Sequence, residues 1–386
     1  MGIRCAGTGE GVMDSVGIGL IGTGFIGKCH AVAYRSVGAI FDAGPPPHLE
    51  MVADVSQGAA DDAARAFGFA RATKDWRALA RDPAVDVVVI ATPNHLHREM
   101  ALAAIAASKH VHCEKPLALT AAEAGEMTEA AEAAGVRTVV GYNYLCNPAV
   151  IHAKDLIAEG RIGDVVYFRG THTEDYMADP EVPFSWRSAR DQAGLGALGD
   201  LGSHIVSLAQ LVVGDVAEVC ADSATVIAER PTAGGARRPV ETEDQAHFMA
   251  RFAGGAMATF EASRVAPGRK LYLGFEVNGT KGSIIFDQER MNELRLFEAA
   301  GPAAQRGFRT ILTGPDHPDY GAFLPAPGHG LGFNDLKVIE AYRLLDAIGA
   351  GKNPYSDFRR AWHIERVLEA VVRSAETRRW VPVAGE

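Results

Sequence analysis

The chain has 386 residues, a length that favours two domains, each with its own core. Hydrophobic residues make up 47% of it and charged residues 22%, close to the averages for globular proteins, which excludes disorder over most of the chain. The formal net charge is -10, and Lys and Arg form no cluster, which argues against nucleic acids and membrane surfaces as partners. Small molecules are the expected partners.

The cysteines and the N-terminus bear on the compartment. The five cysteines lie far apart and form no C-x-x-C pair, as is typical of a reducing compartment, and no apolar run approaches the roughly 18 residues of a membrane span. Residues 1–14 lack the apolar stretch of a secretory signal, so we interpret them either as a disordered extension or as the result of a misplaced start, with Met13 as the alternative start. We therefore expect a cytoplasmic protein.

Residues 15–144 alternate short apolar runs with helical patterns. Strands are predicted at 16–21, 49–54, 85–91, 110–113 and 136–141, and helices after Gly24 and at 58–67, 98–107 and 121–134. Strands this apolar belong to a parallel sheet with helices on both faces. The segment 41–47 (FDAGPPP) is an inserted loop, because consecutive prolines continue neither helix nor strand. This half is predicted to have a Rossmann-type fold.

Residues 145–386 show period-two strands with hairpin turns instead, which predicts an antiparallel sheet. Strands are predicted at 165–173, 218–228, 246–252, 256–263, 271–277 and 283–286, helices at 149–159, 202–213, 335–348 and 358–377, and a long loop at 299–332. The last helices are expected to pack back on the first domain. The predicted fold class is α/β, with the Rossmann domain followed by an α+β domain that has a large, mainly antiparallel open sheet.

The second domain is expected to bind substrate and to form the contacts of an oligomer. The strand residues Phe248, Phe252 and Phe260 are expected on an open, apolar sheet face that a monomer would leave exposed. The sequence therefore predicts an oligomer.

The first motif is G-T-G-F-I-G at 22–27, which follows a predicted strand and opens a helix. Gly22 permits a tight turn, Gly24 lets the backbone approach a pyrophosphate, and Gly27 allows close packing of the helix on the strand. Alone, the pattern could equally be an ordinary glycine turn. With the later motifs it predicts dinucleotide contacts at Gly22, Gly24, Phe25, Ile26 and Gly27.

The second strand ends in Asp54, in the position of an acid that accepts hydrogen bonds from the adenosine ribose. A carboxylate there repels a 2′-phosphate, so NAD is the expected cofactor and NADP the less favoured one. A strand-end Asp that caps the next helix is an equally good interpretation of this residue alone.

Three further motifs follow in order: A-T-P-N-H-L-H at 91–97, C-E-K-P-L at 113–117, and a glycine-rich segment that leads into D-L-G-S-H at 200–204. The first two end predicted strands at the carboxyl edge, where open parallel sheets bind ligands. Together with the glycine loop, these motifs resemble the Gfo/Idh/MocA oxidoreductase family along the whole chain. The resemblance implies that Lys115, Asp200 and His204 meet across a cleft. The further cofactor contacts that it implies are Thr92, Pro93, Asn94, His97, Glu114, Lys115 and Asn143.

The residue types of this triad suit the oxidation of an alcohol. A spacing of four places Asp200 and His204 on one face of a starting helix. Because imidazole titrates at about pH 6.5, His204 is the expected general base for the hydroxyl proton. Lys115 is expected to stabilise negative charge on the oxygen, and Asp200 to orient neighbouring hydroxyls. Without the order of the family's motifs, each would be interpreted as a solvated surface residue.

The expected substrate is a sugar or a cyclic polyol such as an inositol. In the family, Y-N-Y at 142–144 and F-S-W-R at 184–187 flank the cleft, although core packing of Trp186 is an equally good interpretation. The substrate contacts implied are Lys115, Asn143, Trp186, Arg187, Asp200, His204 and, from the late loop, His329. No carboxylate or thiolate cluster at metal-site spacing accompanies the pairs His95-x-His97 and His110-x-His112, so no metal site is expected.

Several departures from the plainest family pattern narrow the branch. The insertion at 41–47, D-W-R at 75–77 and R-G-F-R-T at 306–310 resemble a branch that oxidises an anhydrosugar with NAD at the third carbon of the ring. Pocket side chains that would set specificity are His172, Glu174, Asp175 and Tyr176. Two rivals stay open: a lyase or glycosidase that oxidises transiently with tightly held NAD, and a non-catalytic sugar or dinucleotide sensor.

Overall fold

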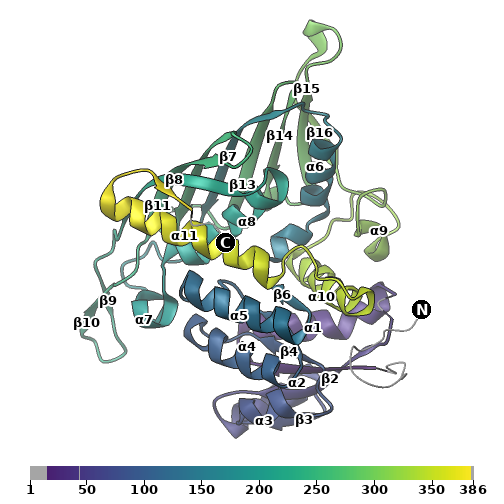
Figure 1. The fold of residues 1–386 in the computed structure, drawn as a ribbon, viewed down its shortest axis with the longest axis vertical. Helices are drawn as coiled ribbons and strands as arrows, with labels where there is room; N and C mark the ends of the chain where they lie inside the picture. Colours follow the sequence, from purple (N-terminus) through teal and green to yellow (C-terminus); the bar gives the residue numbers. More distant parts are fainter. Residues whose placement is uncertain (1–14, 43, 384–386) are drawn as a thin grey trace. The chain divides into compact units, whose positions relative to one another are not determined.

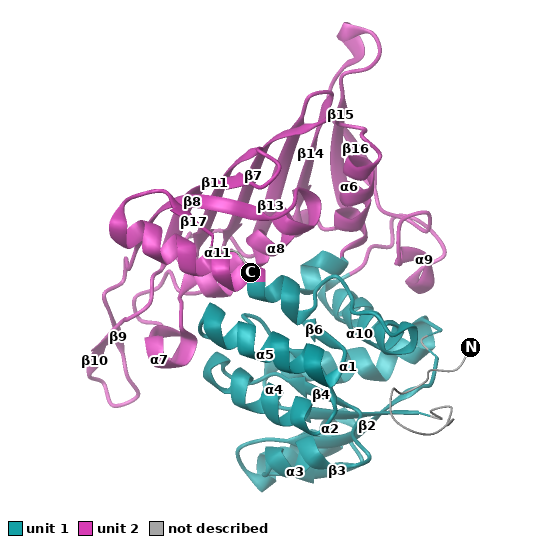
Figure 2. Cartoon of the chain, in the orientation of Figure 1, with its two compact units in different colours: residues 1–146, 332–362 teal, residues 147–331, 363–386 magenta. Residues whose placement is uncertain are grey.

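The computed structural model describes residues 15–42 and 44–383, so the extension expected at 1–14 lies outside the described residues. The chain divides into two compact units (Figure 2). The first comprises residues 1–146 and 332–362, and the second comprises residues 147–331 and 363–386. The sequence predicted a single domain boundary at residue 144. The structure differs from this prediction, because residues 332–362 return to the first unit after the long loop.

The first unit has a six-stranded sheet in which every strand pair is parallel. The strands lie in the order β3-β2-β1-β4-β5-β6. Their bounds are β1 Val16–Ile21, β2 Pro47–Ala53, β3 Arg71–Thr73, β4 Val87–Ile90, β5 His110–Cys113 and β6 Thr138–Val140. This is the predicted Rossmann arrangement, with its reversal of strand order between β1 and β4, where such sheets bind ligands.

Helices flank this sheet (Figure 1). They are α1 Phe25–Ile40, α2 Gln57–Phe67, α3 Trp76–Arg81, α4 His97–Ala106, α5 Ala121–Ala134 and α10 Phe333–Ala350. Side chains of Ser56 and Thr120 cap the starts of α2 and α5, and Gly68 and Gly135 end them in the left-handed conformation. The late helix α10 packs against α1, so residues far apart in sequence share one core.

The second unit has a nine-stranded sheet in the order β16-β15-β14-β13-β7-β12-β11-β8-β17, where only the pair β7 and β12 is parallel. The strands are β7 Val165–Thr173, β8 Val216–Ala224, β11 Gln245–Phe252, β12 Met257–Ser263, β13 Tyr272–Gly279, β14 Gly282–Asp287, β15 Glu293–Glu298, β16 Arg309–Leu312 and β17 Val381–Pro382. The helices are α6 Pro148–Ala158, α7 Arg190–Ala193, α8 Ser203–Val212, α9 Tyr320–Phe323 and most of α11 Phe358–Thr377. The predicted α+β domain with a mainly antiparallel sheet is confirmed.

One face of this sheet is buried and the other is open. The side chains of Phe248, Phe252 and Phe260 are at most 4% exposed and cluster around Phe168, so the expectation that they lie on the open face is wrong. The helix α8 covers that face: a Cβ on Gly170 of β7 would lie 2.5 Å from Ile205 of α8. Strand periodicity pairs these phenylalanines correctly, but it does not tell which face a helix covers.

The sequence patterns did not predict several strands of the structure. They are β3, β15, β16, β17 and a separate hairpin of β9 Glu229–Pro231 and β10 Arg237–Pro239. The region 299–332, expected to be a loop, contains β16 and α9. Apart from β15, which has six residues, these strands have two to four residues and are too short to show a period.

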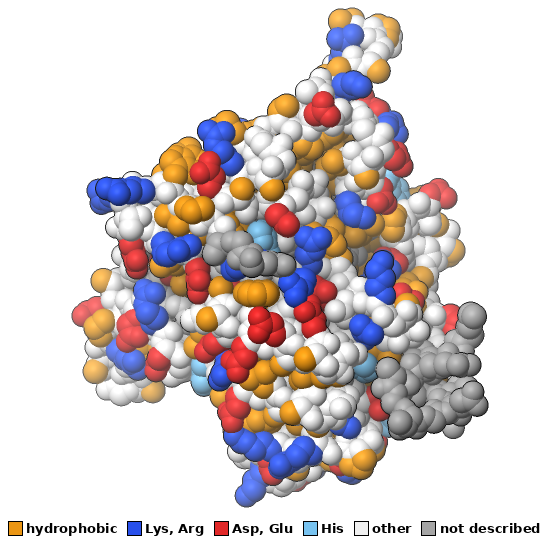
Figure 3. Space-filling view, in the orientation of Figure 1, with side chains coloured by type: hydrophobic (Ala, Val, Ile, Leu, Met, Phe, Trp, Pro, Cys, Tyr) orange, Lys and Arg blue, Asp and Glu red, His pale blue; other side chains and the backbone are white. Residues whose placement is uncertain are grey.

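Acidic and basic side chains are interspersed over the surface seen in Figure 3, as expected for a chain with no basic cluster. By length and composition alone, one helical stretch among the described residues, 190–212, could cross a membrane. Of its most apolar window, 89% is buried inside the structure, as in the core helix of a folded unit, so this is weak evidence for a membrane span.

Candidate active site

The glycine loop forms the turn from β1 into α1, and each glycine is needed for a separate reason. Gly22 has a φ of +96°, and a Cβ on it would lie 2.4 Å from the Ala91 carbonyl oxygen. A Cβ on Gly27 would lie 2.0 Å from the Gly22 carbonyl oxygen, so helix and turn touch there. Gly24 has no heavy atom within 4 Å of its Cβ position, and no side chain caps α1. The start of α1 is thus open to an anion.

Two exposed apolar side chains beside this turn, and a buried amide that follows β6 in the same unit, fit a dinucleotide. Phe25 is 72% exposed and Val55, next to Asp54, is 95% exposed, which places apolar surface beside the loop. Asn143 is buried, and its Nδ2 has no hydrogen-bond partner among the described residues, as expected for an amide that needs a ligand. These observations suit the nucleotide that the motifs predict.

Asp54 follows β2 and lies beside the glycine loop. Its Oδ2 accepts hydrogen bonds from the backbone N of Thr23, at 2.9 Å, and from the Thr23 hydroxyl, and its Oδ1 accepts from the Val55 N at 2.7 Å. The helix cap at α2 is Ser56 instead, so the interpretation of Asp54 as that cap is wrong. The carboxylate is held next to the glycine loop, as a ribose contact requires.

His97 does not fit the expected cofactor contact. The side chain is fully buried, and its Nδ1 lies 2.9 Å from the Pro116 carbonyl oxygen while its Nε2 lies 3.0 Å from that of Thr92. Neither ring nitrogen is left for a ligand. His97 instead joins the T-P-N turn after β4 to the E-K-P turn after β5. Thr92, Pro93 and Asn94 lie on the first of these turns, at the carboxyl edge of the sheet.

Glu114 also differs from its expected cofactor role. Its carboxylate is turned inward, where Oε1 accepts from His30 Nε2 at 2.8 Å and from Lys337 Nζ at 2.6 Å, and Oε2 accepts from the Lys115 N at 3.2 Å. Burial acts to raise the pKa of Glu114, but the Lys337 ammonium and the His30 ring outweigh it and hold that pKa well below its ordinary value. Lys115 itself is partly exposed.

Acid should destabilise the protein through His30, which is buried, and His110, which is largely but not fully buried. Burial, helped by the Lys337 charge, lowers the pKa of His30 to about 4, and burial, helped by Arg137, lowers that of His110 to about 4. Unfolded histidines bind their proton near 6.5, so the unfolded state holds more protons between these values and stability falls as pH falls. At pH 5 each histidine is expected to reduce the free energy of unfolding by about 2 kcal/mol. Urea unfolding at pH 7 and pH 5 measures the loss.

The matched variant is His110→Asn. His110 Nδ1 accepts the Arg137 N–H at 2.9 Å, and an Asn oxygen can accept the same bond without titrating. The loss between pH 7 and pH 5 should shrink in this variant by about 2 kcal/mol. An unchanged loss would contradict the assignment. Glu114 stays ionised in this window and does not contribute.

In the second unit, Asp200 lies in a π-helical turn, Leu198–Gly202, that precedes α8. The helix predicted at 202–213 is observed as α8, Ser203–Val212, so Asp200 lies just before it. Tyr176 donates to Asp200 Oδ2 at 2.7 Å, and Arg187 Nε lies 3.8 Å from the same oxygen. Burial and then the Asp200 charge raise the pKa of Tyr176, so its hydroxyl keeps the proton that it donates. Such π turns are frequent at functional sites.

His204 is buried on the first turn of α8, next to His172 of β7, with ring centroids 5.6 Å apart. His172 is held in turn between the Leu201 carbonyl oxygen, 3.0 Å from Nδ1, and Glu174 Oε1, 3.1 Å from Nε2. The unit therefore brings Asp200, His204 and the expected specificity residues His172, Glu174 and Tyr176 together.

The aromatic and late-loop residues lie in different settings. The guanidinium of Arg187 lies 4.4 Å from the ring centroid of Trp186, and both side chains are partly exposed, so Trp186 is not a core residue. His329 is exposed between Gly328 and Gly330, which both have positive φ.

Sequence reasoning missed the side chains that anchor the loop carrying Tyr176 and Arg187. Arg264 is buried and donates to Asp244 Oδ1 at 2.9 Å and to the Arg187 carbonyl oxygen at 3.3 Å. Arg230, also buried, donates to the Met177 carbonyl oxygen at 2.6 Å. Arg264 directly follows β12 and Arg230 lies in the short strand β9, so no local pattern in the sequence marks either side chain as buried.

His30, His112 and Glu340 offer ligand atoms that lie within 4.8 Å of one another. The Lys337 ammonium, 2.9 Å from Glu340 Oε2, already supplies a cation to this cluster. The four cysteines among the described residues form no disulfide with one another.

Comparison with known proteins identifies the family. Residues 16–142 match the model of an oxidoreductase family with an NAD-binding Rossmann fold, and residues 150–285 match the GFO/IDH/MocA C-terminal domain. The chain is 42% identical to levoglucosan dehydrogenase of Pseudarthrobacter phenanthrenivorans over 96% of this chain and 99% of that protein.

Solved structures agree with this result. Levoglucosan dehydrogenase in complex with NADH and levoglucosan superimposes with a TM-score of 0.94 at 42% identity, covering 96% of this chain and all of that one. An inositol dehydrogenase homologue of Azotobacter vinelandii, complexed with NADH and myo-inositol, gives 0.81 at 25% identity, covering 96% and 98%. The chain belongs to the Gfo/Idh/MocA family of NAD-dependent oxidoreductases.

Proposed function

We propose that this protein oxidises a secondary hydroxyl of an anhydrosugar of the levoglucosan type, or of a related sugar or inositol, with NAD as hydride acceptor. The observation that carries the proposal is the group around Asp200, in which one carboxylate, one phenol, one guanidinium and the nearby His204 lie together. The levoglucosan-bound relative, similar over nearly the whole chain, supports the substrate class.

The first unit supplies the cofactor side. The open start of α1 would hold the pyrophosphate, Asp54 the adenosine ribose, and the Asn143 amide the nicotinamide end. NAD, when bound, supplies the hydride acceptor. The Asp54 carboxylate disfavours a 2′-phosphate, which supports NAD over NADP.

The second unit supplies the substrate side. His204 takes the hydroxyl proton on an imidazole nitrogen, and Lys115 of the first unit stabilises the charge that develops on the oxygen. Asp200, held by Tyr176 and Arg187, accepts hydrogen bonds from neighbouring hydroxyls. Trp186 offers an aromatic face on which a sugar ring stacks. We assign His329 to the substrate side as well.

A substrate panel tests the proposal. Levoglucosan, inositols and aldoses are each offered with NAD and with NADP, and the absorbance of the reduced cofactor is followed. The expected result is NAD reduction with at least one anhydrosugar or inositol. Cofactor that co-purifies without net reduction favours the transient-redox lyase or glycosidase. No reduction with any sugar favours a sensor, and a strong preference for NADP overturns the role of Asp54.

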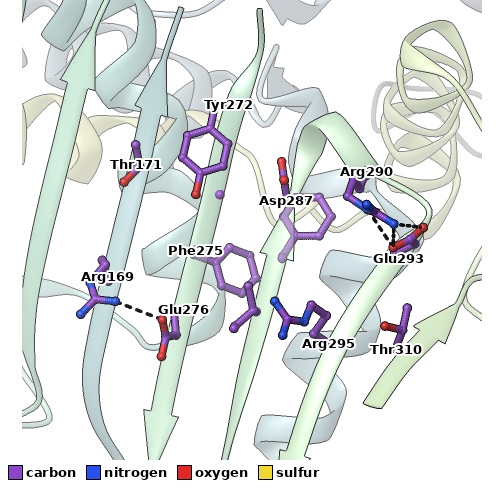
Figure 4. A pocket seen from close by; sticks show the side chains of 13 residues that line it. Arg169, Thr171, Tyr272, Phe275, Glu276, Asp287, Arg290, Glu293, Arg295 and Thr310 are labelled. Carbon is purple, nitrogen blue, oxygen red and sulfur yellow. Dashed lines mark hydrogen bonds and ion pairs between the residues drawn. The ribbon is translucent and has the colours of Figure 1, made fainter. Parts of the chain in front are cut away.

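We further propose a cytoplasmic homodimer or homotetramer that assembles through the open sheet face. That face exposes Met249 and Met257 and has a hollow of about 440 Å³ over β7 and β13–β16, lined by paired charges such as Arg169 with Glu276 (Figure 4). None of the expected site residues lines this hollow. A molar mass in solution equal to one chain would contradict the assembly.

A further inference from the structure

A buried polar network lies behind the E-K-P turn. Its six members are Tyr34, His30, His112, Glu114, Lys337 and Glu340, each at most 6% exposed. They come from α1, from β5 and the residue after it, and from α10, more than 200 positions later in the chain. The network thus joins the dinucleotide helix, the catalytic turn and a late helix within the first unit.

Lys337 is its central cation. The ammonium donates to Glu114 Oε1 at 2.6 Å and to Glu340 Oε2 at 2.9 Å, and Glu340 Oε2 also lies 3.1 Å from His112 Nε2. This series of hydrogen bonds ends at Tyr34, whose hydroxyl lies 3.0 Å from His112 Nδ1. Two carboxylates therefore share one ammonium, which leaves no place for a metal cation between them.

Stability alone does not account for this arrangement. Buried ion pairs are often no more stable than apolar residues of similar volume, and here two acceptors, Glu340 Oε1 and His30 Nδ1, have no hydrogen-bond partner among the described residues. The network instead fixes a position, because several donors hold one buried and ionised carboxylate at once.

Glu114 connects this network to the backbone of Lys115. Glu114 Oε2 accepts the Lys115 N–H, and Gly141 packs so closely that a Cβ there would lie 2.7 Å from the Glu114 carboxylate. On the other side of the turn, His97 Nδ1 lies 2.9 Å from the Pro116 carbonyl oxygen. The backbone of Lys115 is therefore held on both sides, and its long side chain starts from a fixed point.

We infer that Lys337 is a positioning residue for Lys115: it keeps Glu114 ionised and in place, and so fixes the turn from which the Lys115 ammonium reaches the reacting oxygen. This inference rests on the proposed role of Lys115. A displacement of about 1 Å in a catalytic group can lower turnover by about 100-fold, so a residue outside the reaction site can matter this much.

The test compares Lys337→Met with Leu344→Ala, a buried apolar change two turns further along α10. Both variants lose stability, and both are assayed at a temperature where circular dichroism shows them folded. Lys337→Met is expected to lower kcat by about 10- to 100-fold and to raise the deuterium isotope effect on hydride transfer, with the Kd for NADH changed less than threefold. Leu344→Ala is expected to keep kcat and the isotope effect. Equal losses in both variants would overturn the inference.

Two readouts need no substrate, and so they separate this inference from the proposed function. Hydrogen exchange of the Lys115 amide is expected to speed up at least tenfold in Lys337→Met and to stay unchanged in Leu344→Ala. By ¹⁵N NMR, the titration midpoint of His30, which faces Glu114, Lys337 and His112, should move up by more than one pH unit as Glu114 takes a new counter-ion. If Lys337→Met fails to fold, Lys337→Gln is measured in the same way. Unchanged exchange and an unchanged His30 midpoint overturn the inference, whereas an inactive wild type overturns only the proposed function.

Discussion

Replacing His204 by Asn is expected to lower kcat by about two to four orders of magnitude. In the proposed mechanism the imidazole takes the hydroxyl proton, whereas Asn fills a similar volume but does not accept a proton at neutral pH. Because a general base must be unprotonated to act, kcat/KM of the wild type should fall toward acid pH. In the variant, this fall of kcat/KM toward acid pH should be absent. Steady-state kinetics across pH with the best substrate of the panel measures both effects.

The matched control is Ser203→Ala, one residue before His204 on the same turn of α8. Ser203 is buried, and its hydroxyl has no hydrogen-bond partner among the described residues, so its removal should leave kcat within about threefold. Near-wild-type turnover in His204→Asn would refute the role of His204 as the general base. An equal loss in Ser203→Ala would mean that any change in this turn is damaging.

Strand and motif patterns predicted the frame of the site well. The bounds of β1 and β7 agree with the predicted 16–21 and 165–173, and the T-P-N and E-K-P turns follow β4 and β5 as expected. These features depend on local periodicity and on glycine and proline chemistry, which a short window of sequence contains.

The direction of individual side chains was not predictable in the same way. His97 and Glu114 stand inside motifs, so both were expected at the cofactor, yet both point into the core of the first unit. Which way a motif residue points depends on partners elsewhere in the chain, here Lys337 for Glu114. A Lys and a Glu three residues apart in an otherwise apolar stretch of α10 were the only local sign of this partner.

In the second unit, too, the sequence did not predict some features of the site. The spacing of Asp200 and His204 predicted a shared helix face, but the π-helical turn at Leu198–Gly202 leaves no pattern in the sequence. Likewise, the alternation around Phe248 fixes which residues share a face of the sheet, while α8, a separate element, decides which face is buried.

Replacing Lys115 by Met is expected to lower kcat by about 100- to 1,000-fold, the usual effect of removing one group that stabilises a developing oxyanion. Met keeps the length of the stem and removes the charge. Lys109→Met is the control: Lys109 donates to the Asp82 carbonyl oxygen, lies outside the expected site, and should keep its turnover. A kcat within tenfold of wild type in Lys115→Met would refute the oxyanion role.

The double variant Lys115→Met with Lys337→Met joins this prediction to the network behind the turn. Residues that act through one group are not additive in their effects on rate. If Lys337 serves only to place the Lys115 ammonium, then removing Lys337 after that ammonium is gone should lower kcat by less than about twofold more. A full additional loss of 10- to 100-fold would show that Lys337 affects turnover by another route, such as the placement of α1 and its open N-terminus.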